Sequence, residues 1–196
     1  MRKLKLEMQI SLDGYLADVA GKTDWMIWNW GADWKWDAKL QQYHMALAKS
    51  ADHFFISRQM AEEGFNAHWK NVTQDPQDPR FEFARHIVDS KKTVFSTTLK
   101  KSTDIPGGWQ NSDIIGNDYV AYVNELKCQA GEDIIVCGGA TLVSSLIKAD
   151  LIDEFFFIVN PVAIGNGMSI FNERLSLNLS DAIPFACGIV VLHYRR

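Results

Sequence analysis

The sequence has few of the features that mark secreted, membrane-spanning or metal-binding proteins. Its three cysteines, Cys128, Cys137 and Cys187, are widely spaced and form no C-x-x-C pair. Such usage predicts reduced thiols in a cytoplasmic protein and not a disulfide framework. The five histidines show neither an H-E-x-x-H motif nor a His/Cys pairing at ligand spacing. We therefore expect no metal site.

Long apolar runs and basic clusters are also missing. No apolar run approaches the ~20 residues that a membrane-spanning helix needs, and residues 1–7 lack the apolar core of a signal peptide. Lys and Arg occur at most in pairs, and the formal net charge is −4, which argues against a nucleic-acid-binding surface. A chain of 196 residues, 47% of them hydrophobic, suits a single globular domain over residues 1–196.

The most informative stretch is residues 134–143. The apolar residues 134–137 predict a buried strand, Gly138 and Gly139 follow at once, and apolar residues at helical spacing come next. Glycine lets the backbone approach a ligand closely, and the free N–H groups at a helix start attract phosphate. We therefore expect a nucleotide phosphate at residues 138–142. An ordinary strand–helix turn stays open as the alternative, because the G-x-G-x-x-G fingerprint is absent.

Three further predicted strands end in polar turns. An alternating strand over residues 3–12 reaches Asp13-Gly14, and the apolar residues 53–56 lead into Ser57-Arg58-Gln59-Met60. A strand over residues 93–96 continues into Thr97 and Thr98. Arg58 is either a phosphate ligand or a solvated surface cation, and the hydroxyl groups suit a ribose or a phosphate.

The order of elements predicts an α/β fold. Helices are expected over residues 37–49 and 117–130, and further strands over 112–115 and 155–159. Residues 176–182 and 186–195 predict a hairpin that turns around Ile183-Pro184. Alternating strands and helices give a mainly parallel sheet, which this hairpin closes with antiparallel strands.

Five of the seven tryptophans fall within twelve positions, namely Trp25, Trp28, Trp30, Trp34 and Trp36. Such rings form the wall or lid of a ligand pocket, anchor a subunit interface, or seal the edge of a core. The sequence alone leaves these three interpretations open. A surface segment of this kind favours a homodimer.

Together these segments resemble the reductase domain of the bifunctional riboflavin-biosynthesis deaminase/reductase. The resemblance rests on residues 11–15 (Ser-Leu-Asp-Gly-Tyr), on Ser57-Arg58, on residues 96–99 and on the block 134–171. It implies a dihydrofolate-reductase-like, three-layer α/β/α fold. It also implies an NADPH-dependent reductase that transfers hydride to a planar pyrimidine- or pterin-like small molecule, as 5-amino-6-(5-phosphoribosylamino)uracil reductase does.

The resemblance also implies a set of site residues. Asp13 is expected to contact the substrate or relay a proton, and Trp25, Asp37, Glu154 and Asn160 to contact the substrate. Ser11 and Gly14 are expected to border the nicotinamide. The remaining cofactor-binding residues are expected in three turns, namely Ser57, Arg58, Gln59 and Met60; Ser96, Thr97 and Thr98; and Gly138, Gly139, Ala140, Thr141 and Leu142.

This sequence departs from the family pattern in the turns at residues 57–60 and 96–98. Ser57 stands where a Gly is usual, Met60 where a Thr is common, and Thr97 where an Arg is frequent. With one cation fewer near the adenosine phosphate, NADH is an alternative to NADPH. No His-x-Glu with Pro-Cys-x-x-Cys occurs in these residues, so we expect no deaminase activity from them. A dihydrofolate reductase with Asp37 as its acid, and a catalytically silent binding protein, are the other interpretations.

Overall fold

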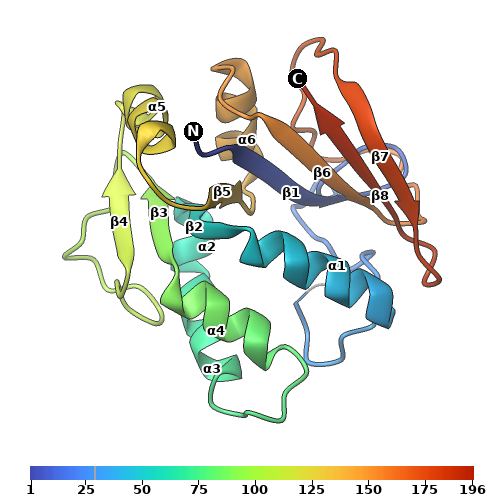
Figure 1. The fold of residues 1–196 in the computed structure, drawn as a ribbon, viewed down its shortest axis with the longest axis horizontal. Coiled ribbons are helices and arrows are strands. Elements are labelled where there is room, and N and C mark those ends of the chain that lie inside the picture. The colour runs from blue at the N-terminus through green and yellow to red at the C-terminus, as the bar shows by residue number, and fades with distance from the viewer. Residues whose placement is uncertain (29) are drawn as a thin grey trace.

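The computed structural model describes residues 1–28 and 30–196. Its centre is an eight-stranded sheet in the order β4-β3-β2-β5-β1-β6-β8-β7 (Figure 1). The six strands from β4 to β6 run parallel, and β8 pairs antiparallel with both β6 and β7. The strands are β1 (Leu4–Ile10), β2 (Ala51–Ser57), β3 (Lys91–Phe95), β4 (Ser112–Ile115), β5 (Asp133–Val136), β6 (Glu154–Val159), β7 (Asn178–Pro184) and β8 (Val190–Arg195).

Helices cover both faces of this sheet. On one face α1 (Ala38–Lys49), α3 (Phe65–Val72) and α4 (Phe81–Asp89) bury an apolar core against Phe54 and Phe156. On the other face α5 (Tyr119–Cys128) and α6 (Ala140–Lys148) pack on β1 and β6. The short helix α2 (Arg58–Glu62) follows β2 directly. The predicted three-layer fold, mainly parallel with antiparallel C-terminal strands, is thereby confirmed.

The central strand β1 is buried on both sides. Leu4, Leu6 and Met8 belong to the core under α5 and α6. The alternate side chains, Lys5, Glu7 and Gln9, turn toward the α1 side and are at most 9% exposed. Charged side chains are costly to bury without partners, and each of these three has one. Lys5 bonds Ser50, Glu7 pairs with His44, and Gln9 donates to the Trp28 carbonyl.

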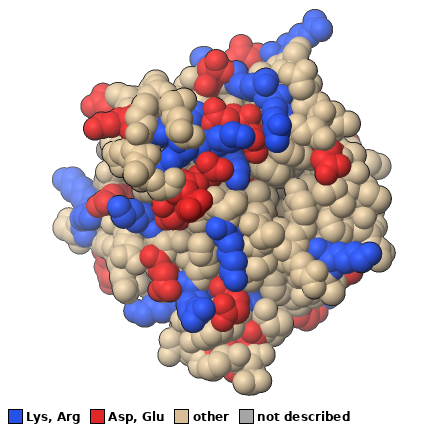
Figure 2. Space-filling model, viewed as in Figure 1, with Lys and Arg blue, Asp and Glu red and all other residues tan. Residues whose placement is uncertain are grey.

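One sequence expectation needs correction at this level. The C-terminal hairpin turns over residues 185–189 and not around Ile183-Pro184, because Pro184 is the last residue of β7. Where the sequence predicts one helix after the turn at residues 57–60, the structure has α2 and α3, and Trp69 and Val72 of α3 pack into the α1-side core. Among the described residues, no helix is long and apolar enough to cross a membrane. On the face shown in Figure 2, acidic and basic side chains are interspersed.

Candidate active site

A groove of about 540 Å³ crosses the carboxyl ends of β2, β3 and β5. Ligands of open α/β sheets bind at this edge, because the strands there end in loops and helix starts. Ten of the residues predicted to bind cofactor line the groove. They are Ser57, Arg58, Gln59, Ser96, Thr97, Thr98, Gly139, Ala140, Thr141 and Leu142. Gly116, Asn117, Tyr119, Ser145 and Met168 line it too, and were not expected from the sequence.

The turn between β5 and α6 requires its two glycines. Gly138 and Gly139 have φ angles of +140° and +80°, which side-chain-bearing residues rarely adopt. A Cβ on Gly139 would come 2.5 Å from the Cβ of Ser57. The turn at Ser57 therefore packs directly against the turn at Gly139, and α6 begins at their junction. The unbonded N–H groups of its first turn meet the groove, where an anion would be stabilised.

Serine hydroxyl groups fix the backbone of the turns at residues 57–60 and 96–98. Ser57 Oγ caps α2 by accepting from the Met60 N–H at 3.2 Å. Ser96 Oγ accepts from the N–H groups of Thr98 and Leu99 at 3.2 and 2.8 Å. Thr97 and Thr98 remain exposed at the groove. These caps fix the backbone on either side of the groove.

Arg58 is half-exposed at the groove and already has a partner. Its guanidinium donates to Glu62 one helical turn later, at 2.7 Å. Such a surface pair contributes little to stability. A ligand phosphate can therefore compete for the guanidinium at small cost. Met60 lies in α2 behind the groove, and its sulfur would be 3.8 Å from a Cβ on Gly138.

Asp13 fastens one loop to another. Its carboxylate accepts from the Ser11 hydroxyl at 2.6 Å and from the Gly165 N–H at 2.7 Å. The hydrogen bond from Ser11, followed by those from the backbone of Gly165 and Ile164, holds the pKa of Asp13 below its usual value. The carboxylate is thus ionised at neutral pH. Gly14, with φ of +86°, forms the tight turn between Ser11 and Tyr15. The geometry gives Asp13 a positioning role, and a proton relay remains a prediction.

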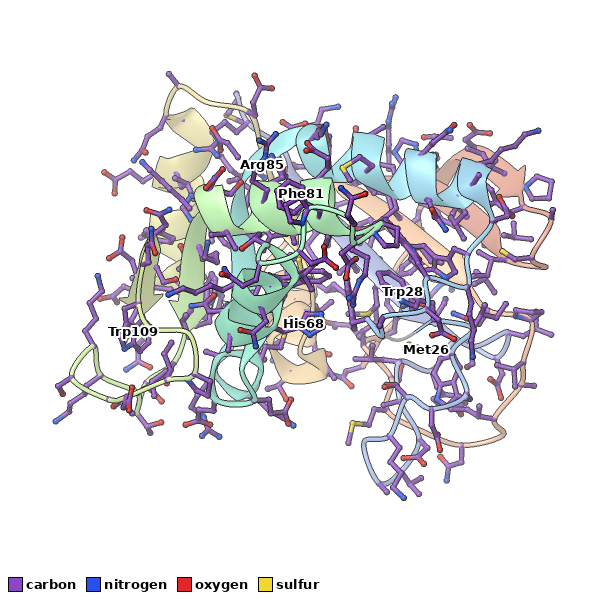
Figure 3. All side chains as sticks on the ribbon, turned by 90° about the horizontal axis from the view of Figure 1, so that it is seen from below. Met26, Trp28, His68, Phe81, Arg85 and Trp109 are labelled. Carbon is purple, nitrogen blue, oxygen red and sulfur yellow. The ribbon has the colours of Figure 1, made fainter. Side chains whose placement is uncertain are left out.

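Asn160 anchors the tryptophan-rich loop to the sheet. It is fully buried, its Oδ1 accepts from the Ile27 N–H at 2.9 Å, and its Nδ2 lies 3.3 Å from Gln9 Oε1. Gln9 in turn donates to the Trp28 carbonyl at 2.9 Å. Two buried amides therefore hold this loop against β1 and β6. Figure 3 shows Met26 and Trp28 on this loop, away from Trp109.

The tryptophans pack mostly on one another. The Trp28 ring, 2% exposed, lies within 5.2 Å (centroid to centroid) of the rings of Trp30, Trp34 and Trp36. Core packing is thus the main role of the segment. Trp30 and Trp36 also line a second, smaller cavity of about 130 Å³ between β1, α1 and α4. Part of the segment is therefore a cavity wall, as one of the sequence interpretations holds.

None of the four expected substrate residues lines either cavity: Asn160 is fully buried as an anchor of the loop, and the other three lie elsewhere. Asp37 is the N-cap of α1: its carboxylate accepts from the N–H groups of Lys39, Leu40 and Cys187. Its carboxylate is therefore satisfied by backbone. Trp25 is half-buried and lies outside the linings of both cavities, so its place as a pocket wall passes to Trp30 and Trp36.

Glu154 is the clearest correction. It is the first residue of β6, at the amino end of the parallel strands and thus at the edge opposite the groove. Its carboxylate, 6% exposed, pairs with Lys3, His193 and Arg195. The sequence-based expectation that Glu154 reaches the cleft relied on its position in the chain, shortly after the phosphate-site helix. Because β6 runs parallel to β1, its first residue lies at the opposite edge of the sheet.

Sequence reasoning missed the buried pair of Glu7 and His44 in the smaller cavity. A signal for each was present. His44 lies four residues after Leu40 and three before Leu47, so it falls within the apolar stripe of α1. Glu7 lies in a strand that helices cover on both faces, where polar side chains must also be buried.

The fold and groove together define a dihydrofolate-reductase-like α/β protein. Sequence comparison makes this definition specific, because the family model described as the RibD C-terminal domain matches residues 2–191. The chain belongs to the RibD C-terminal domain family. Two Bacillus subtilis (strain 168) relatives are similar over nearly their full lengths. The uncharacterized protein YyaP is 29% identical over 98% of this chain and 94% of the relative, and YwjB is 28% identical over 100% and 98%.

Solved structures agree on the fold. A putative riboflavin biosynthesis protein from Shewanella sp. PV-4 has a TM-score of 0.68 at 21% identity, covering 100% of this chain and 99% of that chain. A Thermotoga maritima deaminase/5-amino-6-(5-phosphoribosylamino)uracil reductase has a TM-score of 0.66 at 15% identity, covering 99% and 56%. Enterococcus faecalis dihydrofolate reductase complexed with NADP(H) has a TM-score of 0.57 at 11% identity, covering 99% and 96%.

Proposed function

We propose that this protein is an NAD(P)H-dependent reductase that transfers hydride to a planar pyrimidine- or pterin-like substrate. One observation carries the proposal: three turns that are far apart in the sequence, at residues 57–59, 96–98 and 139–142, line a single groove. All three follow parallel strands at the same edge of the sheet, and membership of the RibD C-terminal domain family supports the same function.

The residues present fit an extended dinucleotide. The Gly139 turn leaves an open cradle where a Cβ would collide with Ser57, and the first turn of α6 presents N–H groups to a pyrophosphate. Ser57, Arg58, Gln59, Ser96, Thr97 and Thr98 would hold the adenosine end. A bound nicotinamide supplies the hydride, while the protein orients the two rings and excludes water. We keep Gly14 as a nicotinamide neighbour. Ser11 is fully buried and bonded to Asp13 and Tyr15, so it would hold this loop and not touch the ring. Met60 and Gly138 would support the phosphate turn.

Two other interpretations are a dihydrofolate reductase and a catalytically silent binding protein, and the structure argues against the first of them. A dihydrofolate reductase needs a free carboxylate on the first helix, and Asp37 has both carboxylate oxygens engaged by backbone N–H groups. A silent binding protein would keep the groove without hydride transfer. Measured binding and turnover separate that alternative from the reductase.

The phosphate turn can be tested with Thr141→Asp. Thr141 is exposed in the first turn of α6, where a negative side chain stabilises a helix by about 0.3–1 kcal/mol. The same charge repels a bound pyrophosphate. We therefore expect the unfolding midpoint to stay or rise while NADPH affinity falls at least tenfold. Thr141→Asn, which is nearly equal in size and neutral, is the matched control.

Thermal-shift titrations with NADPH and NADH measure both effects. A ligand at 100 times its dissociation constant raises stability by about 2.7 kcal/mol. A shift of the unfolding midpoint with NADPH alone would mean that the protein recognises the adenosine phosphate. Equal shifts with NADPH and NADH would mean that it does not distinguish the two cofactors. If neither cofactor shifts the wild-type midpoint at millimolar concentration, the reductase proposal is wrong. If Thr141→Asp binds NADPH like Thr141→Asn, the pyrophosphate lies elsewhere.

A further inference from the structure

The groove across the carboxyl ends of β2, β3 and β5 contains one charged side chain. Of the described residues that line it, Arg58 is basic, and none is Asp, Glu or Lys. The turn after the neighbouring strand β3 lies beside Arg58, because Ser57 and Phe95 are paired. This turn offers the hydroxyl groups of Ser96, Thr97 and Thr98. Recognition of a charged group at this end of the groove therefore depends on one guanidinium.

That guanidinium is already paired with a carboxylate. Arg58 Nη1 donates to Glu62 Oε2 at 2.7 Å, one turn further along α2, and the two side chains are 51% and 41% exposed. The next carboxylate, Glu63, accepts from Gln59 Nε2 at 2.7 Å. The helix thus brings two carboxylates and one cation to this end of the groove. Its charge there is negative, although a cation lines the wall.

The other cations nearby do not replace Arg58 in the groove. Lys101 is paired with Asp113, and Lys100 is exposed but lies outside the groove lining. Thr97, which stands where the family pattern frequently has Arg, is exposed at the groove. The structure therefore shows no second cation in the lining that would offset Glu62 and Glu63.

NADPH and NADH differ by one phosphate on the adenosine ribose. A phosphate monoester carries about −1.5 to −2 charges near pH 7. Opening the exposed Arg58–Glu62 pair costs little by itself, but Glu62 stays within one helical turn of the guanidinium that the phosphate would bind. Like charges at such a distance repel, even where solvent screens them. The 2′-hydroxyl of NADH meets no such repulsion, and the hydroxyl groups of Thr97 and Thr98 can bond it.

We propose that Glu62 sets the cofactor preference of this protein. By holding Arg58 and repelling the adenosine phosphate, it keeps the groove from favouring NADPH over NADH. The inference rests on the proposed function and deepens it. The wild-type protein then binds the two cofactors with dissociation constants within about tenfold of each other. Glu62 is a specificity-determining residue that acts through Arg58.

The test replaces each of the two carboxylates of α2 by an amide in the full chain. Glu62→Gln removes the charge that pairs with Arg58. Glu63→Gln is the matched control, because it removes the same charge from an equivalent pair whose partner, Gln59, is neutral. Dissociation constants for NADPH and NADH are measured at low ionic strength, where exposed charges are least screened. Their ratio is the readout, so a change that weakens both cofactors equally cancels.

We expect Glu62→Gln to shift the ratio toward NADPH by about threefold to tenfold, mainly through tighter binding of NADPH. Glu63→Gln should shift it clearly less. In an Arg58→Gln background, Glu62→Gln should have no larger effect than Glu63→Gln, because the cation that Glu62 holds is gone. Equal shifts for the two carboxylates in the wild-type background would show that net charge alone is responsible, and would overturn the proposal.

Two further outcomes would overturn it. One is a wild-type preference for NADPH above about tenfold. The other concerns Lys100→Gln, which should leave the ratio unchanged. If this variant loses affinity for NADPH and keeps its affinity for NADH, Lys100 recognises the phosphate and Glu62 does not control it.

The proposed function and this inference fail in different ways. Binding of both cofactors with the same ratio in all variants overturns the role of Glu62 and leaves the reductase standing. Binding of neither cofactor by any variant overturns the reductase. Adenosine 2′,5′-bisphosphate and AMP, titrated in parallel, then replace the two cofactors as probes. A ratio for these nucleotides that Glu62→Gln does not change, or binding of neither, would overturn the role of Glu62 as well.

Discussion

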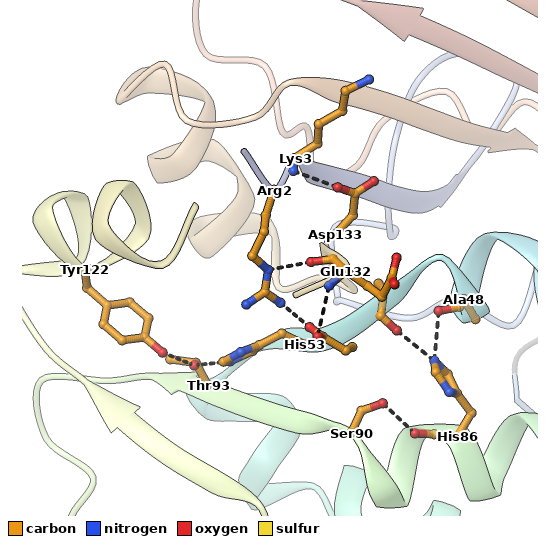
Figure 4. Close-up of polar contacts among 12 residues, drawn as sticks. Arg2, Lys3, Ala48, His53, His86, Ser90, Thr93, Tyr122, Glu132 and Asp133 are labelled. Carbon is orange, nitrogen blue, oxygen red and sulfur yellow. Dashed lines mark hydrogen bonds and ion pairs between the residues drawn. The ribbon is translucent and has the colours of Figure 1, made fainter. Parts of the chain in front are cut away.

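The two edges of the sheet are built for different tasks. At the carboxyl edge, β2, β3 and β5 end in glycine and hydroxyl turns that line an open groove. At the amino edge, the loops and strand starts are joined by ion pairs, among them Lys5–Asp133 at 2.8 Å and Lys127–Asp153 at 2.6 Å. Figure 4 shows this edge, where Arg2 bonds the Glu132 carbonyl and His53 and Tyr122 flank Thr93.

The difference teaches where charge and backbone are useful. Side-chain pairs at the amino edge satisfy one another and leave little for a ligand. Backbone N–H groups at the carboxyl edge remain available because the helices begin there. Variants at the amino edge should therefore change stability without changing ligand binding, and variants at the carboxyl edge should do the reverse.

The largest effect at the amino edge concerns His53 and pH. Burial, and then the charge of Arg2, lowers the pKa of His53 from 6.5 to about 4. Protonation therefore favours the unfolded chain. The stability contributed by neutral His53 is complete above pH 6.5 and is lost as the pH falls toward 4, by about 3 kcal/mol in full.

His53→Gln removes the titration and can keep a bond to Thr93. Urea unfolding at pH 7 and pH 4.5 measures the loss in each protein. We expect a clearly smaller loss for the variant than for the wild type. An equal loss in both would show that other groups cause the acid sensitivity. Cofactor affinity at pH 7 should not differ.

Glu154→Ala should destabilise the fold by about 2 kcal/mol. The carboxylate is 6% exposed and lies against Lys3, His193 and Arg195, so its removal takes the partner from two cations and leaves buried space unfilled. Because Lys3 and Arg195 are half-exposed, the cost should fall below the 3–5 kcal/mol of a fully buried pair. Turnover and NADPH affinity of the folded variant should be unchanged. A large loss of NADPH affinity would contradict the assignment of Glu154 to the edge opposite the groove.

Gly139→Ala tests the carboxyl edge. The added methyl group would meet Ser57 and would sit on a backbone with φ of +80°, so the phosphate turn must shift. We expect at least a tenfold loss of NADPH affinity, or about 1.4 kcal/mol, by thermal shift. Gly116→Ala is the matched control, since Gly116 lines the same groove and its Cβ would make an ordinary 3.7 Å contact with the Ser96 carbonyl.

Arg58→Gln should give the smallest effect. The Arg58–Glu62 pair is half-exposed, so its loss should change stability by less than 1 kcal/mol. If Arg58 reads the adenosine phosphate, NADPH affinity should fall several-fold and NADH affinity should not change. Parallel titrations decide this. Equal changes for both cofactors would remove Arg58 as the phosphate reader.

Much of the fold and the groove could be predicted from the sequence. Apolar runs that end in Gly, Ser and Thr predict the strands and the turns that follow them. The family resemblance, and not these runs, implies that the turns at Ser57, Ser96 and Gly139 form one site, and in the structure all three line one groove. Strand direction is what places Glu154 at the far edge, and chain order alone does not provide it. The cap role of Asp37 depends on Cys187, which is 150 residues away.

The smaller cavity was beyond the sequence for a related reason. Whether a tryptophan faces a ligand, another subunit or the core depends on the path of its loop, and Asn160 and Gln9 set that path by long-range bonds. Trp28 and Trp36 are buried in the core. The homodimer was predicted because the tryptophan-rich segment was expected at the surface. Since Trp28 and Trp36 are buried, that reason no longer applies, and the homodimer stays a prediction.

The place of β1 in the sheet has a consequence for folding. The first strand of the chain lies between β5 and β6, with Leu6 paired to Val136 on one side and to Phe155 on the other. Contacts between such distant residues form slowly, because a long loop must close first. During synthesis β1 leaves the ribosome long before either neighbour exists. The centre of the sheet should therefore be completed late, and until then the apolar face of β1 needs protection from aggregation.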